Sequence, residues 1–169
     1  MKRVLGSLSL RFLDPHQYQA EIGRLFEVVA KEVSRLLPNA NIEHIGASAI
    51  PGAVSKGDLD VFVGVDEHEL EKAVHCLERN GYRVKTDTLK NESLCMLESS
   101  SYEYPVALQV VANGSEFEMF LTFRDALRAN DNLLKEYNQM KHLCEGMSET
   151  RYRNRKSAFI EKVLASLQD

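Results

Sequence analysis

The chain has 169 residues, of which 44% are hydrophobic, and this length and composition suit one domain with a sizeable core. Its 21 Lys and Arg residues are outnumbered by 25 Asp and Glu residues, which excludes the strongly basic class of non-specific nucleic-acid-binding proteins. The three cysteines are widely spaced and form no C-x-x-C pair, which argues against a disulfide framework and against a zinc site.

The first predicted element is an amphipathic helix over 14–36. Asp14 is placed to cap this helix, Pro15 suits its first position, and apolar residues then recur at helical spacing. Two strands are predicted next, "IEHIG" and "LDVFVGV", and a tight loop rich in Gly and Pro joins them.

A second helix is predicted over 66–81, followed by three candidate strands, "YRVKT", "SLCML" and "PVALQVV". The last two should pair as an antiparallel hairpin, and the strands that flank the helix should form a crossover unit. From residue 115 onward the pattern is helical. We therefore predict a single α/β (α+β) domain over 1–169, with a mixed sheet in a core over 14–114 and C-terminal helices over 115–169.

Two aspartates begin the strand "LDVFVGV". Because side chains alternate across a strand, Asp58 and Asp60 project from one face, with Cα atoms about 6.5–7 Å apart. At that separation the carboxylates repel by about 2 kcal/mol at an effective dielectric of 20, and a bound Mg²⁺ would relieve the repulsion. Magnesium held by one or two carboxylates is typical of nucleotide chemistry. The pair therefore indicates a metal site for nucleotide phosphates.

The loop before this strand offers groups that suit a phosphate. Gly46 permits a sharp turn, and a helical turn starting near Ala47 or Ser48 would direct N–H groups at an anion. The Ser48 hydroxyl could add a donor. Taken alone, either fragment is commonly structural, since Asp often solvates a loop end and Gly-Ala-Ser often marks only a turn. The chain has no G-x-x-x-x-G-K-[ST] run and no G-x-G-x-x-G run.

The stretch "IGASAIPGAVSKGDLDVFV" resembles the signature of the polymerase-β-like nucleotidyltransferases, which is a hydrophobic residue, Gly and Gly or Ser, a loop, and Asp-x-Asp in a strand. More narrowly, the chain resembles the GrpB family. The matching residues of this stretch are His44, Ile45, Gly46, Pro51, Gly52, Lys56 and Asp60. Further matches are "FRDALR" with Arg124 and Arg128, and two Y-x-x-x-K motifs, Tyr137 with Lys141 and Tyr152 with Lys156.

The resemblance implies a sheet of the nucleotidyltransferase type, with Asp58 and Asp60 as catalytic metal ligands. It also implies that Gly46, Ala47, Ser48, Lys56, Arg124, Arg128, Lys141 and Lys156 bind the nucleotide. The chain departs from the family pattern at three places. Ala47 stands where the family has Ser, Ala107 and Gln109 replace two histidines, and Asp58 stands where the family often has an apolar residue. Gln109 also lies near the position expected for a third carboxylate, where an amide coordinates Mg²⁺ only weakly.

Several of these residues have structural alternatives. Arg124 and Arg128, one helical turn apart, could grip phosphates or could be surface charges. Lone helix lysines such as Lys141 and Lys156 are mostly solvated. His44 could act as a base or phosphate donor, or as a hydrogen-bonded structural histidine. The run "RYRNRK" over 151–156 could contact RNA or a nucleotide, or could simply face water.

We hypothesise that the chain transfers NMP from an NTP to an unknown hydroxyl acceptor, with Mg²⁺ as cofactor and the NTP as substrate. The first alternative is a catalytically inactive nucleotide-binding or interaction module of the same fold, and the second is RNA binding. No run approaches the roughly 20 apolar residues needed to span a bilayer, so we expect a cytoplasmic protein with no membrane partner. The sequence does not indicate the oligomeric state.

Overall fold

The structure is a computed structural model that describes residues 10–168. Its centre is a five-stranded sheet with strand order β1-β2-β5-β4-β3. The strands are β1 Asn41–Ile45, β2 Leu59–Val65, β3 Arg83–Val84, β4 Leu94–Ser99 and β5 Val106–Ala112. Strands β2 and β5 are parallel, and the other neighbouring pairs are antiparallel. The predicted mixed sheet and the predicted β4–β5 hairpin are therefore confirmed.

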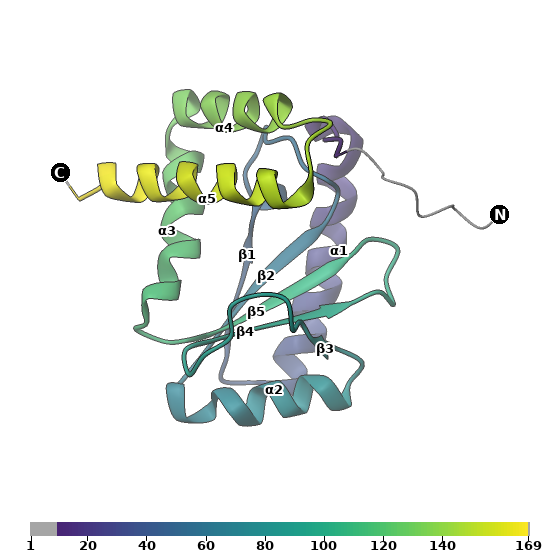
Figure 1. The fold of residues 1–169 in the computed structure, drawn as a ribbon. Coiled ribbons are helices and arrows are strands. Elements are labelled where there is room, and N and C mark those ends of the chain that lie inside the picture. The colour runs from purple at the N-terminus through teal and green to yellow at the C-terminus, as the bar shows by residue number, and fades with distance from the viewer. Residues whose placement is uncertain (1–9, 169) are drawn as a thin grey trace.

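Five α-helices surround the sheet (Figure 1). They are α1 Pro15–Leu36, α2 Leu70–Arg79, α3 Met119–Ala129, α4 Asp131–Leu143 and α5 Glu149–Ser166. Helices α2 and α3 are each shorter than the sequence pattern suggested, because a 3-10 turn precedes each of them, at Glu67–Glu69 and Glu116–Glu118. Helix α2 carries the chain from β2 past two strands to β3, which is the predicted crossover connection. Only Arg83–Val84 of the expected strand "YRVKT" pairs in the sheet.

The two faces of the sheet differ in what covers them. Strand β2 alternates, so that Leu59, Val61 and Val63 enter the main core formed with α1 and α2. Asp60 and Phe62 project from the opposite face, where Phe62 packs with Phe117 and the start of α3. The continuous apolar run of β2 reflects burial on both faces, as is usual for a central strand with a parallel neighbour.

The C-terminal helices lie over the loop that joins β1 to β2. Phe123 of α3, Tyr137 of α4 and Val163 of α5 form a second core with Ile50 and Ala53 of that loop. In Figure 1 these three helices stand beside the start of β2, on the side of the sheet away from α1. This packing places α4 and α5 opposite the aspartates. No helix in the described part of the chain is long and apolar enough to cross a membrane.

Candidate functional site

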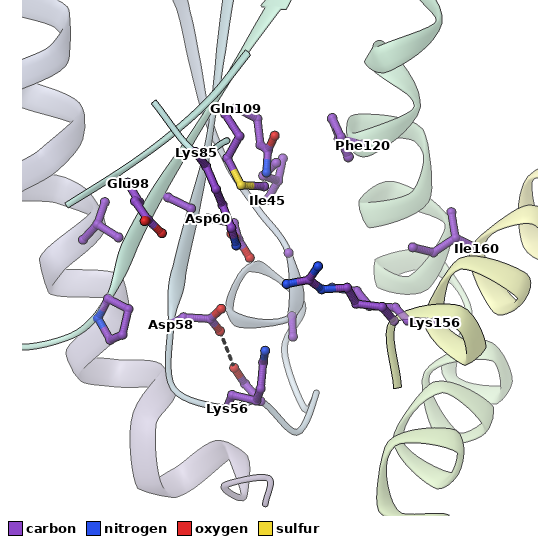
Figure 2. Close-up of a pocket in the computed structure, with 18 of the residues that line it drawn as sticks. Ile45, Lys56, Asp58, Asp60, Lys85, Glu98, Gln109, Phe120, Lys156 and Ile160 are labelled. Atoms are coloured by element: carbon purple, nitrogen blue, oxygen red, sulfur yellow. Dashed lines mark hydrogen bonds between the residues drawn. The ribbon is translucent and has the colours of Figure 1, made fainter. Parts of the chain in front are cut away.

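A cavity of about 460 Å³ lies between the sheet and the C-terminal helices. Its floor is the face of the sheet that carries Asp60, and its walls come from the β1–β2 loop, α3, α4 and α5. Side chains that are distant in the sequence meet there, as Figure 2 shows for Asp58, Asp60, Lys56 and Lys156. The cavity therefore brings together the two predicted metal ligands and several of the predicted phosphate ligands.

Asp58 and Asp60 lie at the start of β2, and both line this cavity. Asp58 precedes the strand by one residue, and its Oδ1 accepts a hydrogen bond of 3.4 Å from the Ser55 hydroxyl. That hydroxyl in turn accepts from the Gly57 N–H at 3.0 Å, so the loop backbone fixes its position. Asp60 is held within the sheet between Ile45 of β1 and Ala107 of β5.

Gly46 is required beside Asp60 for two reasons. Its φ of 75° lies in the left-handed region that favours glycine. A Cβ atom at this position would also lie 2.5 Å from Asp60 Oδ2, closer than any van der Waals contact allows. The glycine that sequence analysis assigned to a sharp turn therefore also makes room for the carboxylate of Asp60.

The environment of the cavity disfavours ionisation of both Asp58 and Asp60 when no counter-ion is bound. Burial, and then the neighbouring Asp58 carboxylate, raise the pKa of Asp60 to about 7, although nearby lysines lower it. The pKa of Lys156 is raised above its ordinary value, chiefly by Tyr137, with further contributions from Tyr152, Asp60 and Asp58, so this ammonium stays charged. The Lys156 ammonium thus faces the carboxylates of Asp58 and Asp60 and neutralises only part of their charge.

Lys141 and Lys56 approach the same space from different elements. Lys141 of α4 is only 2% exposed, and its Nζ donates to the Val54 carbonyl at 2.8 Å and lies 4.3 Å from the Tyr137 ring centre. Burial, followed by the charge of Lys156, lowers the pKa of Lys141. Lys56 is more exposed and pairs with Glu149 at 3.5 Å. Lys141 therefore anchors the loop as well as lining the cavity, whereas Lys56 can turn toward a ligand.

The register of β5 shows which residue could supply a third metal ligand. Ala107, and not Gln109, is directly opposite Asp60, and Glu98 of β4 is the next residue across the sheet. Glu98 lines the cavity, although sequence reasoning did not single it out. Among residues 10–168, no three His, Cys, Asp or Glu side chains lie close enough together to hold a metal ion. In the described residues, Asp58 and Asp60 therefore have no third such side chain close enough to share a metal ion with them.

Comparison with known proteins gives the family. The model of the GrpB protein family matches residues 15–166. The chain belongs to the GrpB family. A UPF0157 protein of Vibrio cholerae is 54% identical over 161 residues, covering 95% of this chain and 85% of that protein. A UPF0157 protein of Halalkalibacterium halodurans is 28% identical over 177 residues, covering 95% of this chain and 88% of the relative.

Solved structures confirm the predicted nucleotidyltransferase-type fold for this GrpB chain. The conserved protein GrpB from Enterococcus faecalis superposes with a TM-score of 0.66 at 20% identity, covering 90% of this chain and 98% of that one. A cytoplasmic RNA terminal U-transferase gives a TM-score of 0.52 at 15% identity, covering 73% of this chain and 38% of that chain. The Cid1 poly(U) polymerase bound to MgGTP gives a TM-score of 0.50 at 12% identity, covering 72% of this chain and 40% of that chain.

Two further residues of the GrpB motifs, Arg124 and Arg128, hold the backbone around the turn at Gly46. Arg124 Nη1 donates to the His44 carbonyl at 3.0 Å and pairs with Glu43 at 3.0 Å, and Arg128 Nε donates to the Ala49 carbonyl at 2.8 Å. Neither arginine lines the cavity, in contrast to the phosphate contacts that their motif suggested. Their guanidinium groups instead hold one backbone carbonyl before the 3-10 turn Ala47–Ala49 and one in its last residue.

His44 and Ser48 form a hydrogen bond with each other. His44 Nε2 lies 2.8 Å from the Ser48 hydroxyl, and the imidazole stacks on Phe26 with ring centres 4.7 Å apart. Neither residue lines the cavity, whereas Gly46 and Ala47 do. Burial, and then the positive charges of Arg128 and Arg124, lower the pKa of His44 to about 4. The ring is therefore neutral at physiological pH and braces the turn.

Sequence reasoning missed three charged residues of the cavity, which are Arg83, Lys85 and Glu98, whereas Arg153 belongs to the basic run over 151–156 that it did single out. Glu98 and Lys85 come from the β3–β4 side of the sheet, and Figure 2 shows both among the residues that line the cavity. The signal for Glu98 was an acidic residue at the end of the apolar strand "SLCMLES", but only the strand order shows that it shares a row with Asp60.

Proposed function

We propose that this protein is a magnesium-dependent nucleotidyltransferase that transfers NMP from an NTP to the hydroxyl of an acceptor still to be identified. The observation that carries the proposal is the carboxylate pair Asp58 and Asp60 on the floor of a cavity whose opposite wall bears Lys156. The GrpB family membership and the nucleotidyltransferase-like neighbours support the same reaction class.

The donor set of the cavity fits magnesium. Asp58 and Asp60 present carboxylate oxygens, which hard cations prefer. Burial, and then repulsion from Asp58, raise the pKa of Asp60, and a divalent cation would relieve that repulsion. Asp58 and Asp60 would hold the ion together with oxygens of the nucleotide phosphates. When bound, magnesium neutralises charge on the phosphoryl group that is transferred.

The side chains of the chain then have distinct roles. Lys56 and Lys156 bind the phosphates by charge, since they face the carboxylates from the loop and from α5. Gly46 and Ala47 let the substrate approach the backbone closely, and Arg124 and Arg128 keep that backbone in place. The acceptor hydroxyl oxygen forms a bond to the α-phosphorus and gives up its proton to water, the bond from that phosphorus to the bridging oxygen breaks, and pyrophosphate leaves.

Thermal unfolding with Mg²⁺ and each of the four NTPs tests the binding part of the proposal. At a ligand concentration a hundred times the Kd, the native state gains about 2.7 kcal/mol, which raises the Tm of a domain of this size by about 5–10 °C. Asp58→Asn and Asp60→Asn should lose this gain. Asp87→Asn, at an exposed loop position, is the matched control and should keep it. Equal responses of all four proteins would contradict the site assignment.

A second function is favoured by the residue opposite Asp60. Because Ala107 has no side chain that can bind a metal, an inactive nucleotide-binding or interaction module of the same fold accounts for the cavity equally well. Such a module binds MgNTP but releases no pyrophosphate with any hydroxyl acceptor supplied, including RNA. RNA binding alone, through the exposed Arg151 and Arg155 of α5, would instead fall steeply with salt and survive Asp60→Asn.

A further inference from the structure

Gln109 is a polar residue in the interior of the central strand β5. Its side chain is only 6% exposed, and the residues on either side of it in the strand, Leu108 and Val110, are fully buried. No hydrogen bond joins its amide to the other cavity residues drawn in Figure 2. The amide is also not among the fully buried polar atoms without a partner, which in residues 10–168 are the hydroxyls of Tyr82 and Ser115, so it is open to the cavity and can bind a ligand there.

The side chain of Gln109 opens into the cavity, where most of its neighbours are apolar. In the sheet it lies beside Phe62 of β2 and Met96 of β4, and Ile45 and Phe120 complete the surroundings of this end of the cavity. Figure 2 shows Gln109 and Phe120 on the side of Asp60 away from Lys56. The cavity therefore has one end with both aspartates and Lys156, and another end where Gln109 lies among apolar side chains, with Lys85 next to Met96 at the edge of the sheet.

The distance along β5 gives the separation between the Asp60 end and the Gln109 end of the cavity. Gln109 follows Ala107, the residue opposite Asp60, by two positions, which is about 6.5–7 Å along the strand. A carboxamide offers one acceptor oxygen and two N–H donors in one plane, and apolar side chains around it suit the two faces of a flat ring. Nucleobases combine apolar faces with an edge of donors and acceptors. A group at Asp60 and a base at Gln109 would be separated by about the size of a ribose.

We propose that Gln109, with Ile45, Met96 and Phe120, forms a subsite that reads the hydrogen-bonding edge of a nucleobase. This inference rests on the proposed function, because it takes the phosphates to lie at Asp58 and Asp60. The base has two chemical sources, which are the NTP itself and a nucleoside that serves as acceptor. In both cases the amide selects among bases, while the phosphates supply affinity that does not depend on the base.

Calorimetric titration of Gln109→Leu tests the subsite, since leucine preserves volume and removes the amide. The probes are the four NTPs and inorganic tripolyphosphate, each with Mg²⁺, and the four nucleosides added to protein saturated with the NTP. Gln139→Leu, at an exposed position of α4, is the matched control. Because leucine has a similar volume and the position opens into a cavity, Gln109→Leu should melt within a few degrees of the wild type, which excludes misfolding as the cause of lost selectivity.

If the NTP supplies the base, wild-type affinities for the four NTPs should differ by about threefold to tenfold, the range of one hydrogen bond, and converge to within about twofold in Gln109→Leu. Tripolyphosphate affinity should not change. If the acceptor supplies the base, the NTPs should bind alike, and one nucleoside should bind the NTP-loaded protein only when Gln109 is present.

The two proposals fail in different ways. The subsite is overturned if NTPs bind but neither NTP nor nucleoside selectivity depends on Gln109, and the proposed function then stands. If no triphosphate binds the wild type, the proposed function is overturned, and the subsite is overturned with it because it rests on phosphates bound at Asp58 and Asp60.

Discussion

Protonation of His44 should destabilise the fold in mildly acidic solution. The imidazole is packed on Phe26 and accepts or donates one hydrogen bond at Ser48, while the guanidinium groups of Arg124 and Arg128 face it from α3. Burial and these two positive charges lower its pKa from 6.5 to about 4. A cation at this position would be both desolvated and repelled, so the folded state keeps the ring neutral.

The sign and size of the effect follow from this pKa. Between pH 6.5 and about 4 the unfolded chain binds a proton at His44 and the folded chain does not, so stability falls as pH falls through this window. Each tenfold change in proton affinity is worth about 1.4 kcal/mol, so the full loss below pH 4 is about 3 kcal/mol. About 2 kcal/mol of it should be lost by pH 5. Above pH 6.5 His44 has no effect on the pH dependence.

Urea unfolding of the wild type and His44→Gln at pH 7 and pH 5, followed by circular dichroism, measures this loss. The glutamine cannot titrate, so the stability difference, wild type minus variant, should fall by about 2 kcal/mol between pH 7 and pH 5. His16→Gln, at an exposed position of α1, controls for the loss of a histidine. If the wild type and His44→Gln lose stability in parallel over this range, the imidazole is not held neutral by Arg124 and Arg128, and the reasoning is refuted.

Three further substitutions test the neighbourhood of the turn by urea unfolding. Gly46→Ala should cost at least about 1–2 kcal/mol for its positive φ, and less in an Asp60→Ala background, because the clashing carboxylate oxygen is gone; equal costs in the two backgrounds would remove the steric argument. Arg124→Met should cost about 1–3 kcal/mol at pH 7, because it leaves the buried carbonyl of His44 without its donor; an unchanged midpoint would refute that role. Lys141→Met should become relatively less stable than the wild type as pH rises toward 10.5, because the folded chain releases the Lys141 proton more readily than the unfolded chain; a constant difference would show that the ammonium is not destabilised by burial.

The binding residues were predictable where the signal was local. Asp58 and Asp60 share a face because alternation acts over two residues, and Gly46 is needed for a turn whose φ is set by its own backbone. Lys141 and Lys156 were singled out by motif, and both line the cavity. The burial of Lys141 was not foreseen from the sequence, because a lysine on an isolated helix carries no mark of what will pack over it.

Other assignments needed contacts between distant segments. Arg124 and Arg128 looked equally suited to phosphates and to solvent, and only the docking of α3 against β1 shows that they hold the carbonyls of His44 and Ala49. The register of β5 made Ala107 the neighbour of Asp60 and brought Glu98 into the same row. Neither relation follows from spacing within one strand, since strand order sets which residues meet across a sheet.

The sequence by itself determined the identity of most elements, the shared face of the two aspartates and the resemblance to the GrpB family, because periodicity, turn chemistry and motif order are properties of neighbouring residues. The tertiary structure alone decided which side chains face the cavity, which cations are buried and which residue lies opposite Asp60. The physical reason is that strand order and helix docking depend on how apolar faces contributed by all segments are buried together, and this burial is settled only when the whole chain packs.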